Sequence, residues 1–206
     1  MEDVLEIYQL PYNKKRPVVC LDEANRQLIG EVQQHRPVRP GQVALYDYEY
    51  IRNGVANLFV MFEPLTGQRQ IKVTARRTKE DFAHCLRDLA EIHYPDVEKI
   101  VIVMDNLNTH TLASLYVAFE PKKARHLAER FEIHYTPKHG SWLNMAELEI
   151  NALSRQCLAR RIPHIEEMNN EVQAWVAQRN NHKTTVRWQF TTADARIKLR
   201  HLYPRI

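Results

Sequence analysis

Cysteine is scarce in this sequence of 206 residues, and long apolar runs are absent. The three cysteines (Cys20, Cys85 and Cys157) lie far apart among apolar residues, which fits neither a disulfide framework nor a zinc site. We expect them to be reduced core residues. No apolar run approaches the roughly 18 residues that a membrane-spanning helix needs, and the chain does not open on a signal peptide. These absences favour a cytoplasmic protein without a membrane partner.

The short motifs of several common enzyme classes are also missing. The sequence contains no Gly-rich phosphate-binding loop and no Gly-x-Ser-x-Gly nucleophile elbow, and its ten histidines have no paired zinc spacing. What remains is an ordinary globular composition, 44% hydrophobic and 26% charged, with a formal net charge of +4. That charge is compatible with nucleic acid as a partner but is too small to establish it.

The first part of the chain predicts an antiparallel meander. Residues 1–10 have the pattern of a short helix, and Pro11 ends it. Residues 16–25 and 26–33 indicate a strand and its hairpin partner, with a turn between them. Residues 55–76 indicate two more strands, joined by a Pro-Leu-Thr-Gly turn.

Beyond residue 77 the apolar spacing becomes helical. Residues 78–94 predict a helix in which Thr78 and Asp81 form a capping box. Further helices are expected at 112–130, 143–159, 165–180 and in the basic C-terminal tail, and strands at 99–105 and 131–137. A meander of three strands from the first part of the chain, with the two later strands parallel, predicts an α/β fold: a five-stranded mixed sheet flanked by helices.

Two aspartates each close an apolar strand in this prediction. Asp22 follows VVCL, and Asp105 follows IVIVM. Ligand sites in such sheets lie beyond the ends of central strands, so the two carboxylates are candidates together. Ionised carboxylates repel each other, and Mg²⁺ or Mn²⁺, which prefer oxygen ligands, would remove that cost. Either aspartate alone could instead form a turn or cap a helix.

A third acid would complete a site for two metal ions, the arrangement that supports phosphodiester cleavage. The helix predicted at 143–159 offers Glu147 and Glu149. Each lies ~80° from the centre of the helix's apolar stripe, on opposite sides. The helical pattern does not choose between them, and a lone glutamate at such a position is most often solvated.

Taken with their surroundings, these residues give the chain a family resemblance. The blocks LDE, MDNLNTH and TPKHGSWLNMAELE resemble the three acidic blocks of DDE transposases from bacterial insertion sequences related to the mariner group. The resemblance implies an RNase H-like catalytic domain at residues 17–206, after a helical lead-in at 1–16. It also implies that Asp22, Asp105 and Glu147 are the catalytic ligands of two Mg²⁺ or Mn²⁺ ions, and that Glu149 is a bystander.

The resemblance implies an activity and partners as well. The activity is metal-dependent cleavage of DNA strands at transposon ends, followed by transfer of the freed strand into target DNA. A homodimer or larger assembly on DNA, in the bacterial cytoplasm at the nucleoid, is implied too. Such transposases carry an N-terminal helix-turn-helix region; this sequence shows none, so we expect a truncated chain or a separately encoded half. Two alternatives stay open: a nuclease of the same fold without strand transfer, and a non-catalytic DNA-binding remnant of a mobile element.

Several residues near the acids are candidates for DNA binding. Lys138, His139 and Trp142 precede the third acid in a polar and aromatic segment that could hold a phosphate and stack a base, although Trp142 could equally anchor the core. Arg76 and Arg77 belong to a basic set of which some members should face phosphates. The other members of that set are Arg69, Lys72, Arg196, Lys198 and Arg200.

Three further residues are predicted to support the acids. Asn106 could orient water or phosphate or could stabilise a turn, and His110 could contact DNA, contact an acid or pack at a helix start. Asn144 is expected to cap the helix that carries the third acid.

Overall fold

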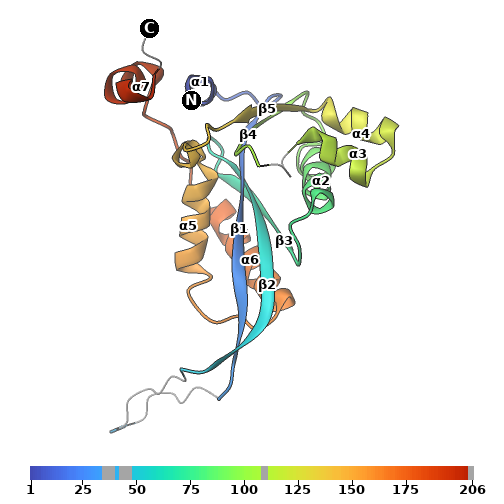
Figure 1. Cartoon of the computed structure of the whole chain (residues 1–206), viewed down its shortest axis with the longest axis vertical. Helices are drawn as coiled ribbons and strands as arrows, with labels where there is room; N and C mark the ends of the chain where they lie inside the picture. Colours follow the sequence, from blue (N-terminus) through green and yellow to red (C-terminus); the bar gives the residue numbers. More distant parts are fainter. Residues whose placement is uncertain (34–39, 42–47, 108–110, 204–206) are drawn as a thin grey trace.

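A computed structural model describes residues 1–33, 40–41, 48–107 and 111–203. Within these residues a single sheet has the strand order β3-β2-β1-β4-β5, with helices on both faces (Figure 1). The β1–β2 and β2–β3 pairs are antiparallel, and the β1–β4 and β4–β5 pairs are parallel. The five-stranded mixed sheet predicted from the sequence is therefore confirmed. Its strands are β1 (Val18–Glu31), β2 (Tyr50–Glu63), β3 (Gln68–Thr74), β4 (Ile100–Met104) and β5 (Phe131–Tyr135).

Most of the predicted helices are present. The helix predicted at 78–94 begins with the expected capping box between Thr78 and Asp81 and continues into a π-helical turn at Leu89–His93. No helix of the described residues is both long and apolar enough to cross a membrane. The α-helices are α1 (Glu2–Gln9), α2 (Lys79–Asp88), α3 (Leu115–Ala118), α4 (Pro121–Ala128), α5 (Ala146–Gln156), α6 (Ile165–Asn181) and α7 (Thr192–Lys198).

The helical stretch predicted at 112–130 is divided in the structure. A 3₁₀ turn leads into α3, Phe119 is extended, and α4 starts with Pro121 at its first position. Proline cannot continue a preceding helix but fits the first turn of a new one, so the break falls where the sequence places Pro121.

The hairpin predicted between residues 16–25 and 26–33 is wrong. β1 runs unbroken from Val18 to Glu31 and pairs with β2 from Cys20–Phe62 to Glu31–Tyr50. The polar run after Leu21 looked like a turn, but it belongs to a partly exposed strand, whose solvent-facing positions tolerate polar side chains. Asp22 consequently lies inside a strand and does not close one.

Alternate residues of the central strands pack on opposite faces of the sheet. Val19, Leu21 and Ile102 contact the layer of α2, α3 and α4. Cys20, Val101 and Val103 lie on the other face, against α1 and the start of α5. Because side chains alternate along a strand, Asp22 belongs to the face of Cys20. Figure 1 shows α5 on one side of the sheet and α2, α3 and α4 on the other.

Candidate active site

The parallel register of β1 and β4 brings the two aspartates side by side. Cys20 pairs with Val103 in the ladder. Continued for two residues beyond this last pair, the same alignment brings Asp22 opposite Asp105, which directly follows the last residue of β4. Neighbouring strands are about 4.8 Å apart, and both aspartates share the face of Cys20 and Val103. Both are half-buried, so they lie in one row of the sheet where it opens toward solvent.

The glutamate after Asp22 lies on the other face of the sheet. The Glu23 side chain is only 4% exposed, and its Oε2 lies 3.4 Å from Nε of Arg77. The Glu23 backbone N–H donates a 2.8 Å hydrogen bond to Asp22 Oδ1. The strand therefore directs one acid of the LDE block toward α5 and the other toward an arginine.

Asn144 ties the start of α5 to β1 directly beside Asp22. Its side chain is buried, and its Nδ2 donates a 2.8 Å hydrogen bond to the carbonyl oxygen of Leu21. Its Oδ1 accepts a 3.1 Å hydrogen bond from the N–H of Ala146, the first residue of α5. One side chain thus caps the helix and fixes its position along β1.

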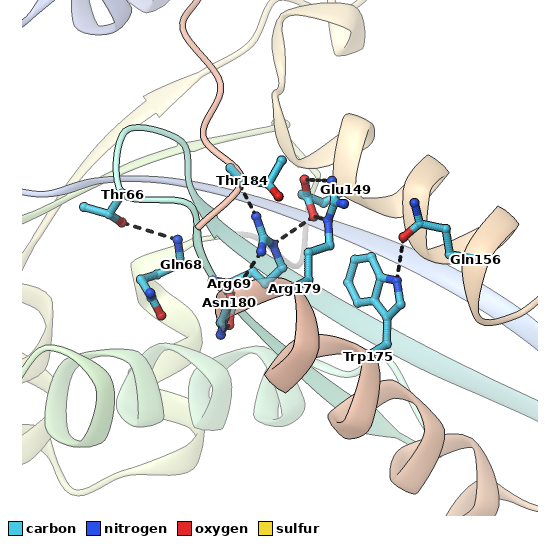
Figure 2. A network of polar contacts seen from close by, with 9 residues as sticks. All are labelled: Thr66, Gln68, Arg69, Glu149, Gln156, Trp175, Arg179, Asn180 and Thr184. Atoms are coloured by element: carbon cyan, nitrogen blue, oxygen red, sulfur yellow. Dashed lines mark hydrogen bonds and ion pairs between the residues drawn. The ribbon is translucent and has the colours of Figure 1, made fainter. Parts of the chain in front are cut away.

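The two glutamates of α5 have opposite environments. Glu147 is exposed, whereas Glu149 is 1% exposed. Glu149 accepts hydrogen bonds from Arg179, at 2.8 Å from Nε and 3.0 Å from Nη2, and its Oε2 lies 2.9 Å from Nε of Arg69 (Figure 2). A buried carboxylate held by two guanidinium groups is not available to a metal ion, so of the two candidates Glu147 alone is accessible. Glu149 is an interior ion-pair partner.

The sheet order indicates the direction in which Glu147 points. α5 lies over β1 and β2. Glu149 leans toward β3, which carries Arg69. Residues two positions apart in an α-helix are rotated by about 200° around its axis. Glu147 therefore lies on the side of α5 opposite Glu149, toward β4. In the order β3-β2-β1-β4, that is the side of the two aspartates.

The acids do not form a closed metal cage. In residues 1–33, 40–41, 48–107 and 111–203, no three histidine, cysteine, aspartate or glutamate side chains lie close enough to hold a metal ion. The β1–β4 register therefore relates Asp22 to Asp105, and the helical spacing puts Glu147 on the β4 side of α5. Asn106, next to Asp105, is exposed, and His110 lies outside the described residues.

The segment that leads into α5 carries three of the predicted DNA-binding residues. Lys138 and His139 are exposed. Trp142 is 43% exposed, stacks on Trp188 with ring centroids 6.2 Å apart, and meets Phe190 edge-on. Trp142 is thus anchored by an aromatic cluster and still presents part of its ring to solvent.

Part of the basic set is engaged within the chain. The expectation that Arg69 is a solvated or phosphate-facing charge is wrong, because its side chain is fully buried. Lys72 Nζ lies 2.6 Å from Asp88 Oδ2, and Arg196 holds Glu2 through two hydrogen bonds of 2.7 Å. Arg76 and Arg77 are exposed.

Sequence reasoning missed the buried arginine network, although a signal was present. Arg69 alternates with Ile71 and Val73 along β3, which places it on their face of the sheet. An arginine at an inward position predicts a buried acidic partner, since an unpaired interior charge is costly. Burial lowers the pKa of Arg69 and Glu149 opposes that shift, while hydrogen bonds to Glu149 raise the pKa of Arg179.

Comparison with known protein families and curated proteins gives one family match. Residues 17–169 match a family described as DDE superfamily endonuclease. No curated protein matches the chain.

Solved structures share the fold at low sequence identity. A Mos1 transposase paired-end complex with the left transposon end matches with a TM-score of 0.59 and 16% identity, over 93% of this chain and 60% of that chain. A Mos1 mariner paired end complex with Mn matches with a TM-score of 0.55 and 17% identity, over 89% of this chain and 56% of that chain. The fold is therefore RNase H-like, and the chain spans less than two thirds of the length of each of these neighbours.

Proposed function

The chain belongs to the family of DDE superfamily endonucleases, and from this premise we propose that it cleaves DNA strands at the ends of a mobile element and transfers them into target DNA. The proposed metal ligands are Asp22, Asp105 and Glu147, and the proposed cofactor is a pair of Mg²⁺ or Mn²⁺ ions. The observation that carries the proposal is the row of the sheet that aligns Asp22 with Asp105 on the face covered by α5.

The donor set suits these cations. Three carboxylates offer hard oxygen ligands without nitrogen or sulfur, the preference of Mg²⁺ and Mn²⁺. Bound there, such ions would neutralise phosphate charge and lower the pKa of an attacking water. Of the proposed ligands, Asp22 lies in β1 and Asp105 directly follows β4. Glu147 is exposed, so its side chain can turn toward the aspartates without breaking a buried contact.

The surrounding side chains suit a DNA strand. Lys138 and His139 are exposed on the segment just before α5, where they would bind a backbone phosphate. The exposed part of Trp142 would stack on a base. Arg76 and Arg77 are exposed and would bind backbone phosphates away from the aspartates, because Arg77 lies beside Glu23 on the face of the sheet opposite Asp22.

The proposed partners follow from the same chemistry. Two ends of an element must be cut and joined together, so the working form would be a homodimer or larger assembly on DNA, located at the nucleoid of a bacterial cell. The solved neighbours are paired-end complexes. Recognition of the end sequence would fall to a helix-turn-helix region, either on a longer form of this chain or on a separately encoded partner.

Incubation of the purified chain with a supercoiled plasmid that carries the DNA flanking its gene, in Mg²⁺ or Mn²⁺, tests the proposal. We expect nicked and joined products from the wild type, not restricted to the element ends without the helix-turn-helix region, and none from Asp105→Asn. The control is Asp96→Asn, which removes an exposed carboxylate that has no place in the proposed site. Cleavage without joined products would support the nuclease alternative instead. Binding without cleavage would support a non-catalytic remnant.

A further inference from the structure

A buried ion network connects α5 to the far side of the sheet. Its centre is Glu149, held by Arg69 from β3 and Arg179 from α6 (Figure 2). The two terminal nitrogens of Arg69 are engaged as well: Nη1 donates to Asn180 Oδ1 at 3.3 Å, and Nη2 donates to the carbonyl oxygen of Thr184 at 3.0 Å. The network thus joins a strand, two helices and the segment after α6 at one point.

Stability alone does not account for this arrangement, because burying charges has a large desolvation cost. Two guanidinium groups and one carboxylate leave an excess positive charge in the interior, where Arg69 and Glu149 are almost fully buried. Desolvation of buried charges often cancels their mutual attraction, and apolar side chains of similar size stabilise a core as well or better. The best-attested use of such groups is to specify one arrangement of the packed elements.

The geometry shows which arrangement the network specifies. Arg179 contacts both oxygens of Glu149, a two-point contact that fixes the direction of the carboxylate. Glu149 is therefore held toward β3, and the rotation of α5 about its axis is set. Asn144 holds the start of the same helix to Leu21. These two anchors bracket Glu147, three residues after one and two residues before the other.

We propose that Arg69 and Arg179 are positioning residues for Glu147, an inference that rests on the proposed function. In this role both arginines act through Glu149. By clamping Glu149 they hold α5 at the rotation that directs Glu147 toward Asp22 and Asp105. The two aspartates need no such device, because the sheet register fixes them.

The variant Arg179→Met tests the inference while leaving Glu149 paired with Arg69. We expect faster amide hydrogen exchange in the first turn of α5, and Mn²⁺ affinity about tenfold weaker by calorimetry, as for residues that orient a metal ligand. Arg179→Lys keeps the charge but not the two-point contact, so we expect it to restore less than half of the lost affinity. The matched control is Arg16→Met, which breaks the similar two-point contact of Arg16 with Glu132; both readouts should stay at wild-type values.

Each other outcome counts against the inference in a distinguishable way. If exchange in α5 is unchanged in Arg179→Met, the network does not hold the helix. If exchange rises while Mn²⁺ affinity per folded molecule stays at the wild-type value, the network contributes stability without positioning Glu147. Full rescue by Arg179→Lys would assign the effect to charge and not to orientation. If the wild type binds no Mn²⁺, the proposed function fails, and this inference fails with it.

Discussion

Two acidic pairs, Asp22–Glu23 on β1 and Glu147–Glu149 on α5, place their two carboxylates on different sides of one element, and they do so in different ways. Each pair offers one acid to the candidate site and gives the other to arginine: Glu23 to Arg77, and Glu149 to Arg69 and Arg179. On β1 the alternation of the strand separates the two acids, and the ladder with β2 fixes that alternation. On α5 the separation depends on helix rotation, which a helix packed on one face does not fix by itself. The buried network supplies that constraint.

The largest expected effect separates Asp22 from Glu23. Asp22→Asn should reduce DNA cleavage by at least about a thousandfold, equivalent to about 4 kcal/mol of barrier, because a metal ligand is lost. Glu23→Gln should leave cleavage readily measurable, since Glu23 faces the other side of the sheet. Both are measured as single-turnover cleavage rates with Mn²⁺, with folding checked by circular dichroism. Equal losses of cleavage rate in the two variants would contradict the assignment of Asp22, and not Glu23, to the proposed site.

The next effect separates Glu149 from Glu147 by stability. Glu149→Gln should lower the free energy of unfolding by about 3 kcal/mol, because the buried Arg69 and the partly buried Arg179 lose their counter-charge. Glu147→Gln should leave stability within about 0.5 kcal/mol, because Glu147 is exposed, and should abolish cleavage. Urea denaturation gives the stabilities. The assignment of the two acids would be contradicted if Glu147→Gln lost several kcal/mol of stability, or if Glu149→Gln were as stable as the wild type.

A smaller effect is expected at the second anchor of α5. Asn144→Ala should cost about 1–2 kcal/mol of stability, because both the cap of Ala146 and the bond to the Leu21 carbonyl are lost. Asn144→Asp keeps the cap acceptor and loses the donor to Leu21. If cleavage falls more than stability in Asn144→Asp, the bond to β1 positions the helix; if the two fall in proportion, Asn144 acts as a cap alone.

The smallest effect concerns an exposed ion pair, as a contrast to the buried network. Hydrogen bonds from Arg196 and Tyr203 lower the pKa of Glu2 to about 2. The folded-state pKa lies below the ordinary value, so the pair stabilises the fold above about pH 4.5 and loses its contribution as pH falls toward 2. Arg196→Met should raise the pKa of Glu2 in an NMR titration, and added salt should weaken the pair. A Glu2 pKa unchanged by Arg196→Met would contradict the pairing of α1 with α7.

Local patterns predicted much of the fold. The capping box of α2, the apolar run of β4 and the alternation in β3 follow from residue type and spacing alone. The long β1 did not follow, because its polar middle resembles a turn until its pairing with β2 is known. The choice between Glu147 and Glu149 was equally out of reach. It depends on the partner that each side of α5 meets, and Arg69 and Arg179 are distant in sequence.

The resemblance to the family blocks singled out the three acids, but sequence spacing could not show that two of them, Asp22 and Asp105, are neighbours across two strands. Asp22 and Asp105 are 83 positions apart, and only the parallel pairing of Cys20 with Val103 sets them in one row. The metal site at that row remains our proposal.

Isothermal calorimetry with Mn²⁺ tests that site most directly. We predict uptake by the wild type and by Asp96→Asn, and loss of that uptake in Asp22→Asn, Asp105→Asn and Glu147→Gln under the same conditions. Uptake of equal affinity in all five proteins would show that the ions bind elsewhere and would contradict the account.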